Sequence, residues 1–232
     1  MTPILFIPGF MLDHDLWADV ESLLVPIRPI MHAEMRDATS IPDLARRALA
    51  AAPCRFSLVG FSMGGYVARE MVRMAPGRVD RLILIATSAR PDSEPQSRAK
   101  QAAQIDPGRF HGISRASIRQ ALAHERQDEE LLVERVRRTS LRLGGETYRR
   151  QSGFRRGGDG DRLAVIACPT LIVAGRHDRL RSLAEAEELR DGIPGAQLAV
   201  LPVGHMIPLE APRELAQLLR AFFAGATSAV TP

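Results

Sequence analysis

A serine flanked by glycines, in Gly60-Phe61-Ser62-Met63-Gly64, separates two segments of different character. The apolar run 55–60 before it predicts a buried strand, and the amphipathic stretch 63–74 after it predicts a helix. A tight strand-to-helix turn is expected between them, because glycines remove side chains that would clash around a strained serine. The alternative is an ordinary glycine-rich turn.

Further apolar runs predict other strands. They cover residues 3–8, 28–33, 80–87, 169–174 and 197–201. Amphipathic segments between these runs predict helices. They cover residues 15–24, 41–52, 183–190 and 210–223. Buried strands that alternate with helices indicate the α/β fold class, with a mostly parallel central sheet flanked by helices.

The segment 91–162 interrupts this alternation. It contains no strong strand, and its periodicity predicts helices over 114–125 and 131–143. Gly144-Gly145 is expected to be a loop at the end of the second helix. The expected division is therefore an α/β core, 1–90 and 163–232, and a helical insertion, 91–162.

Positive charge is concentrated in the same part of the chain. Residues 88–162 hold 16 of the 31 basic residues but only 11 of the 27 acidic residues. Nucleic-acid-binding proteins usually interleave basic and aromatic residues, whereas aromatic residues make up only 5% of this chain. We therefore expect no nucleic-acid partner. The arginines indicate either an acidic substrate or partner, or an ordinary exposed surface.

The sequence gives no sign of a membrane or of a metal. No apolar run approaches the roughly 18 residues of a membrane-spanning helix, and no basic leader with a long apolar run opens the chain. Cys54 and Cys168 lie far apart, outside any metal-ligand spacing, and are expected to be free thiols at the starts of buried strands. The expected compartment is the cytoplasm.

A serine hydroxyl needs a neighbouring base to act as a nucleophile at neutral pH. Of the six histidines, His205 follows the predicted strand 197–201 through Pro202-Val203-Gly204. The carboxyl ends of parallel strands share one edge of a sheet, so His205 can face Ser62 there. The alternative for His205 is a structural role in its loop. His14 could line the pocket, but the preferred interpretation is a polar loop residue.

A base of this kind needs an acidic partner that fixes its tautomer. Asp178 follows the predicted strand 169–174 and is the first candidate. Two alternatives remain open. Asp178 could instead be a helix N-cap, and Asp92, which follows strand 80–87, could be the acid.

The oxyanion formed during attack on a carbonyl needs hydrogen-bond donors. The backbone N–H of Met63, directly after Ser62, is one candidate. The turn Pro8-Gly9-Phe10 offers the second, from the N–H of Phe10. Gly9 would let the backbone pass close to the substrate, unless it is a simple turn glycine.

Four segments, in this order, resemble the α/β-hydrolase superfamily of esterases and lipases. They are Ile7-Pro8-Gly9-Phe10, the serine turn 60–65, the run 169–175 leading to Asp178, and Gly204-His205-Met206 leading to Leu209, Glu210 and Pro212. The resemblance covers nearly the whole chain and implies the catalytic order Ser62, Asp178, His205, with 91–162 as a helical cap over the site. One departure is Pro8-Gly9, where the family often has His-Gly. The serine argues against haloalkane dehalogenases and epoxide hydrolases, which use a carboxylate nucleophile.

The expected function is hydrolysis of a carboxylic ester or thioester through an acyl-enzyme on Ser62, with no metal or organic cofactor. The arginine-rich segment suggests a small-molecule substrate that is acidic or carrier-bound. The superfamily also contains lyases of menaquinone synthesis, perhydrolases and carbon–carbon bond hydrolases, and these stay open. A ligand-binding protein on the same scaffold is a further alternative. A monomer or homodimer is expected.

Overall fold

The structure is a computed structural model that describes residues 2–24, 29–94, 97 and 106–225. Six strands form one sheet in the order β2-β1-β3-β4-β5-β6, and all neighbours pair in parallel. The strands are β1 (Ile4–Ile7), β2 (Ile30–His32), β3 (Phe56–Phe61), β4 (Val79–Ile85), β5 (Thr170–Gly175) and β6 (Gln197–Leu201). Each predicted strand is present, and the α/β fold class is confirmed.

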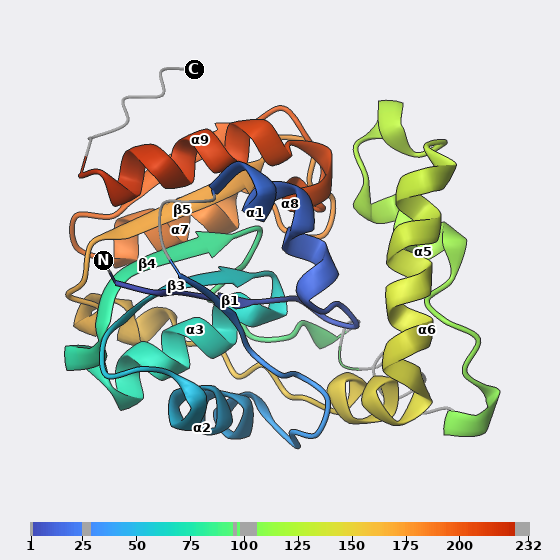
Figure 1. Cartoon of the computed structure of the whole chain (residues 1–232), viewed down its shortest axis with the longest axis horizontal. Coiled ribbons are helices and arrows are strands. Elements are labelled where there is room, and N and C mark those ends of the chain that lie inside the picture. Colours follow the sequence, from blue (N-terminus) through green and yellow to red (C-terminus); the bar gives the residue numbers. More distant parts are fainter. Residues whose placement is uncertain (1, 25–28, 95–96, 98–105, 226–232) are drawn as a thin grey trace.

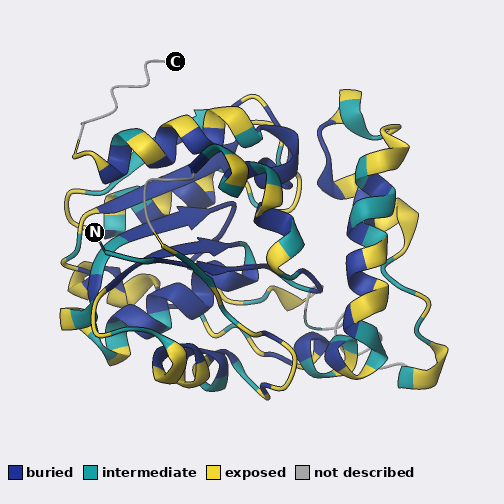
Figure 2. Cartoon of the chain, in the orientation of Figure 1, coloured by how far each residue is buried: buried dark blue, intermediate teal, exposed yellow. Residues whose placement is uncertain are grey.

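Helices cover both faces of this sheet (Figure 1). One buried cluster joins the sheet to α1 (Ala18–Leu24), α8 (Ile207–Glu210) and α9 (Pro212–Phe223), and the other joins it to α2 (Ile41–Ala51), α3 (Met63–Met74) and α7 (Leu183–Gly192). Successive strand residues alternate between the clusters, so that Phe6 enters the first and Ile7 the second. The inner strands β1, β3 and β5 are buried along their length, whereas the edge strands β2 and β6 are only partly buried. Most helices are buried on one side only (Figure 2).

The strand order places a crevice at the carboxyl ends of β1 and β3. From β1 the chain moves outward to β2 and then returns to β3 on the other side of β1. Parallel sheets bind ligands where the connections diverge in this way, because no loop covers the gap between the two strand ends. The segments that leave the sheet there begin at Pro8 and at Ser62.

The predicted insertion lies between β4 and β5. It contains α5 (Arg115–Ala121) and α6 (Glu130–Ser152), which stand beside the carboxyl ends of the strands (Figure 1). Five short 3-10 helices complete the described elements: His14–Trp17, Pro76–Arg78, Pro107–Arg109, His124–Arg126 and Gly160–Val165.

Several predicted boundaries were wrong. The expected loop at Gly144 is a kink inside α6, since Gly144 adopts φ 80° and ψ 170° and helical structure then continues to Ser152. The expected helix 114–125 ends at Ala121. The expected helix 210–223 is split at Ala211 (φ −139°), because the residue before a proline, here Pro212, is forced out of the helical region.

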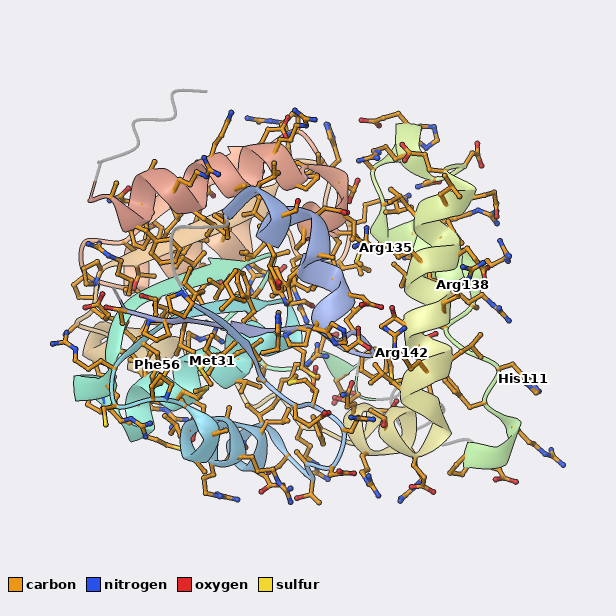
Figure 3. The ribbon with its side chains drawn as sticks, in the orientation of Figure 1. Met31, Phe56, His111, Arg135, Arg138 and Arg142 are labelled. Atoms are coloured by element: carbon orange, nitrogen blue, oxygen red, sulfur yellow. The ribbon has the colours of Figure 1, made fainter. Side chains whose placement is uncertain are left out.

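Arginines on α6 tie the insertion to the start of the chain. Arg142 pairs with Asp13 and Asp15, and Arg135 pairs with Asp19. Figure 3 shows Arg135 and Arg142 pointing from α6 toward the core, while Arg138 points away from it. Many of the arginines that suggested an acidic partner therefore already face carboxylates of this chain.

The two ends of the insertion meet over α3 at a buried ion pair. The backbone N–H of Asp159 donates to Ala89 O at 2.9 Å, so the chain returns to the place where it left β4. The Asp159 carboxylate accepts two hydrogen bonds of 2.9 Å from Arg69, which is fully buried, and one of 2.8 Å from Arg73. Burial alone would raise the pKa of Asp159, but the bonds from Arg69 and Arg73 outweigh it and hold the pKa below its ordinary value.

Cys54 and Cys168 are free thiols, as expected, but the expectation of burial was wrong for Cys54. Cys54 is exposed because β3 begins only at Phe56, and Cys168 is half-buried. Burial raises the pKa of the Cys168 thiol. None of the helices in the described part of the chain combines the length and apolar character needed to cross a membrane.

Replacement of Asp159 by Asn is expected to lower the free energy of unfolding by about 3–5 kcal/mol, because it leaves the buried guanidinium of Arg69 without its carboxylate. The pKa of Asp159 is lower in the folded protein than in the unfolded chain. The ionised carboxylate of Asp159 therefore adds fully to the free energy of unfolding above about pH 4. This contribution is lost as the pH falls through the folded-state pKa. Urea denaturation between acid and neutral pH measures both effects.

Asp161→Asn is the matched control, since the side chain of Asp161 is 81% exposed and meets only Arg162, at 3.8 Å. It should change stability by less than about 0.5 kcal/mol. Equal effects of the two substitutions would contradict the role given to the buried pair.

Candidate functional site

Ser62 occupies a strained turn between β3 and α3. Its backbone has φ 51° and ψ −113°, a conformation that costs a residue with a side chain about 1–3 kcal/mol. Two hydrogen bonds hold it there: Ser62 N–H donates to Ile85 O, and Thr87 Oγ1 donates to Ser62 O, both at 2.8 Å. The predicted tight turn is therefore present, and it is anchored to the end of β4.

The flanking glycines are required by close approach of backbone. A Cβ on Gly64 would lie 2.2 Å from Ile7 O, and a Cβ on Gly60 would lie 2.6 Å from Gly64 O. Neither position can hold a larger residue unless the backbone moves. These contacts bring the start of α3 against the end of β1, beside the loop that carries Phe10.

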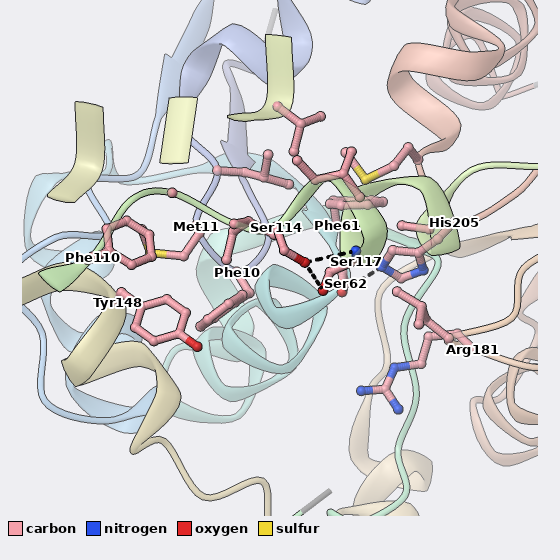
Figure 4. A pocket seen from close by; sticks show the side chains of 18 of the residues that line it. Phe10, Met11, Phe61, Ser62, Phe110, Ser114, Ser117, Tyr148, Arg181 and His205 are labelled. Atoms are coloured by element: carbon pink, nitrogen blue, oxygen red, sulfur yellow. Dashed lines mark hydrogen bonds between the residues drawn. The ribbon is translucent and has the colours of Figure 1, made fainter. Parts of the chain in front are cut away.

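His205 connects Ser62 to Asp178. Its Nε2 lies 3.0 Å from Ser62 Oγ (Figure 4). Its Nδ1 lies 2.7 Å from Asp178 Oδ2. The side chains of His205 and Asp178 are 7% and 1% exposed, so bulk water hardly reaches the bond between them. The structure thus brings together the three residues that the sequence proposed, in hydrogen-bonding geometry.

The second oxygen of Asp178 orders its own loop. Asp178 Oδ1 accepts hydrogen bonds from the backbone N–H groups of Leu180 and Arg181, at 2.7 and 2.9 Å. The carboxylate therefore holds a turn and contacts His205 at once. The alternative that Asp178 is a helix N-cap was wrong, because Ser182 is the N-cap of α7. Asp92, the other candidate acid, instead accepts from the backbone N–H of Arg156 at 2.9 Å.

The remaining histidines do not contact Ser62. His14 and His32 line a separate cavity, so the idea that His14 lines the pocket of Ser62 was wrong. Burial lowers the pKa of His32, against the opposing effect of Glu21. His124 is exposed on the insertion, and His111, which the sequence did not single out, lines the cavity of Ser62.

Two backbone N–H groups are available beside Ser62. Met63 is the first residue of α3, where a backbone N–H has no acceptor within the helix. The N–H of Phe10 makes no hydrogen bond to the described residues. Gly9 lies so close that a Cβ there would be 2.9 Å from Phe61 Cδ1 and 3.3 Å from Ser62 Cβ.

Gln151, which sequence analysis missed, fixes the loop that carries Phe10. Its Oε1 accepts from Met11 N–H at 2.8 Å, and its Nε2 donates to Met35 O at 3.2 Å. Gln151 is 1% exposed, and Met11 adopts a positive φ of 53°. A buried amide at the end of α6 therefore holds the backbone directly after Phe10.

Glu210, also missed as a functional residue, holds the loop of His205. Its carboxylate accepts hydrogen bonds from the backbone N–H groups of Gly204 at 3.1 Å, Met206 at 3.0 Å and Ala123 at 2.8 Å. The N–H of His205 itself donates to Ala121 O at 2.8 Å. The only signal in the sequence was the position of Glu210, five residues after His205.

A cavity of about 710 Å³ opens beside Ser62 and His205. On one side it is aromatic, with the rings of Phe110 and Tyr148 stacked at 4.7 Å and Phe10 at 5.7 Å from Tyr148 (Figure 4). Residues of α5 and α6 help to close it, among them Ile118 and Val136. The insertion therefore forms one wall of the cavity.

A single group of candidate metal ligands occurs among the described residues. Asp13, His14 and Asp15 place one ligand atom each within 4.8 Å of one another. Arg142 pairs with both carboxylates and offsets their charge. The group does not belong to the cavity of Ser62.

Substitution of Glu210 by Gln is expected to destabilise the protein by about 1–3 kcal/mol, because an amide N–H₂ would then face backbone N–H groups that are buried. The free energy of unfolding in urea measures this. Glu214→Gln on the exposed side of α9 is the matched control and should have little effect. A Glu210→Gln protein as stable as the control would show that these bonds do not hold the loop.

Comparisons with known proteins agree with this architecture. Residues 54–212 match the sequence profile of the alpha/beta hydrolase fold family. The chain is 26% identical over 240 residues to a pimeloyl-[acyl-carrier protein] methyl ester esterase of Photobacterium profundum, and the match covers 94% of this chain and 93% of that protein.

Solved structures show the same fold. A thermophilic esterase from Thermogutta terrifontis superposes with a TM-score of 0.85 at 24% identity, over 97% of this chain and 90% of that one. The enol-lactonase of Burkholderia xenovorans LB400 gives 0.83 at 19% identity, over 96% and 91%. The profile match spans more than half of this chain. Together with these structural similarities, it shows that the chain belongs to the alpha/beta hydrolase fold family.

Proposed function

We propose that this protein is a carboxylic ester hydrolase in which Ser62 is the nucleophile, His205 the general base and Asp178 its acidic partner. The observation that carries the proposal is the continuous path of hydrogen bonds from Ser62 Oγ through both nitrogens of His205 to Asp178, at 3.0 and 2.7 Å. A nucleophile, a base within reach and a group that orients the base are the requirements of acyl transfer.

In the proposed reaction, His205 Nε2 takes the proton of Ser62 as Oγ attacks the ester carbonyl. The tetrahedral intermediate collapses, and His205 returns the proton to the leaving alcohol. A water molecule activated by the same imidazole then hydrolyses the acyl-enzyme and releases the acid. Asp178 stabilises the imidazolium that forms in both steps.

The N–H groups of Phe10 and Met63 are proposed to hold the oxyanion, with Gly9 giving the substrate room to approach. Both donors are fixed before substrate binds, Met63 by the start of α3 and Phe10 by the bond between Gln151 and Met11. Donors fixed in advance lower the barrier because they need no reorganisation during the reaction.

We further propose that residues 91–162 act as a cap over this core, since α5 and α6 close the cavity above Ser62. The name of the Photobacterium profundum relative favours an ester of an acyl chain on a carrier protein as substrate. The ion pairs of Arg135 and Arg142 with the core do not add support for that partner, because these guanidinium groups are already engaged.

Wild-type protein is expected to hydrolyse a series of p-nitrophenyl esters, and Ser62→Ala is expected to lower kcat by about 10³-fold or more. Ser117→Ala is the matched control, because Ser117 lines the same cavity but its hydroxyl pairs with Ser114 at 2.8 Å. Equal turnover by wild type and Ser62→Ala would overturn the proposal. If wild type turned over none of the esters, ester hydrolysis would be rejected in favour of a non-hydrolytic reaction at the same site.

Asp178→Asn should reduce kcat on p-nitrophenyl butyrate by about 10³–10⁴-fold, the loss expected when the base is left in the wrong tautomer. Asp92→Asn tests the competing assignment and should cost less than about tenfold, because its carboxylate contacts the backbone of Arg156. A larger loss from Asp92→Asn than from Asp178→Asn would reverse the roles.

A further inference from the structure

Two partly buried arginines line the cavity of Ser62. Arg156 and Arg181 both face the cavity that Ser62 and His205 share. Together with Arg109, three arginines are among its described lining residues, and no aspartate or glutamate is. The wall of this cavity is therefore cationic.

Within the described part of the chain, the guanidinium of Arg156 forms an ion pair with Asp92 but donates no hydrogen bond. Its side chain is 13% exposed and its Nη1 lies 3.9 Å from the carboxylate of Asp92, beyond hydrogen-bonding distance. Its Nε is buried without any partner. The guanidinium lies over the ring of Tyr66, 5.6 Å from the centroid, and Tyr66 is one helical turn from Ser62.

Arg181 is held beside the acid of the site. Its backbone N–H donates to Asp178, as described above, and its side chain is 10% exposed. The guanidinium makes one long bond, 3.4 Å from Nη1 to Glu185 Oε1. The other oxygen of Glu185 is used by the N–H of Ser182 at 2.7 Å. The other guanidinium N–H groups of Arg181 donate to no acceptor among the described residues. In Figure 4 the head group of Arg181 lies below the ring of His205.

The two guanidinium groups also repel each other. Burial lowers the pKa of Arg156, and the charge of Arg181 lowers it further, against the opposing effect of Asp92. Asp92 and Glu185 already offset part of these two charges, but several N–H donors of the guanidinium groups stay unused, and unsatisfied buried donors are costly. An anion between the two would accept hydrogen bonds from both.

We propose that Arg156 and Arg181 form a carboxylate-binding subsite, and that the preferred substrates are monoesters of dicarboxylic acids. The free carboxylate would lie on the arginines while Ser62 attacks the ester carbonyl at the other end, and the alcohol part would occupy the aromatic side of the cavity. This inference rests on the proposed ester hydrolysis and narrows its substrate class. Guanidinium groups suit this role because their paired N–H donors match the two oxygens of a carboxylate.

The test compares monobenzyl esters of succinic, glutaric and adipic acid with benzyl esters of monocarboxylic acids of equal chain length. Wild type should favour the anionic member of at least one pair. Arg156→Gln and Arg181→Gln should each lower kcat/KM for that anionic ester by roughly 10- to 100-fold, the value of a lost charge-assisted hydrogen bond, and leave the neutral ester within about threefold. Because both esters are measured on the same protein, partial unfolding cancels in the ratio.

Arg179→Gln is the matched control, since Arg179 is exposed, does not line the cavity and carries the same charge two residues from Arg181. This substitution should leave the ratio of kcat/KM for the anionic ester to kcat/KM for the neutral ester unchanged. An equal loss on both esters in the Arg156 and Arg181 variants would overturn the subsite, whereas the hydrolase assignment would stand as long as turnover depends on Ser62.

Inhibition distinguishes the kind of anion. Glutarate should compete with the anionic ester more strongly than inorganic phosphate does at equal ionic strength, and Arg156→Gln should abolish that difference. Stronger competition by phosphate would overturn the assignment of the subsite to carboxylates.

Discussion

The close contact between the ends of β1 and β3 controls the geometry of the site. Gly64 touches the carbonyl of Ile7, so the strained turn at Ser62 and the loop at Phe10 cannot move independently. Hydrogen bonds from the end of β4 then hold the strain of Ser62 in place. A serine and two backbone donors are thereby brought to one point by the sheet itself, and this arrangement exists before any substrate arrives.

The insertion also helps to hold the loops around Ser62, from the side opposite the sheet. Gln151 directs the Phe10 loop, and Glu210 joins the loop of His205 to the end of α5. Asp159 fastens the returning end of the insertion to α3. The groups proposed to carry out acyl transfer lie on the core, but the side chains that orient them are shared between core and insertion. A substitution far from Ser62 can therefore alter the site without touching the reacting atoms.

Sequence was sufficient to propose Ser62, Asp178 and His205 because each directly follows an apolar run, and parallel strands end at a common edge. Gln151 and Glu210 could not be found in this way, since their partners are backbone groups up to 140 residues away, which leave no local pattern. The kink at Gly144 was mistaken for a loop because a glycine pair predicts a break but not whether a helix resumes after it. The pairing of Arg142 with Asp13 likewise depends on tertiary structure.

The junction at Ala123 bears on how such insertions can be exchanged between members of the family. A Cβ on Gly204 would lie 2.4 Å from Ala123 N, and the same N–H is bound by Glu210. Residues 121–123 thus fit the loop of His205 as closely as a core element does. A chimaera that grafts a foreign insertion between β4 and β5 would have to keep this tripeptide, or carry its own counterparts of Gly204 and Glu210, for His205 to hold its position.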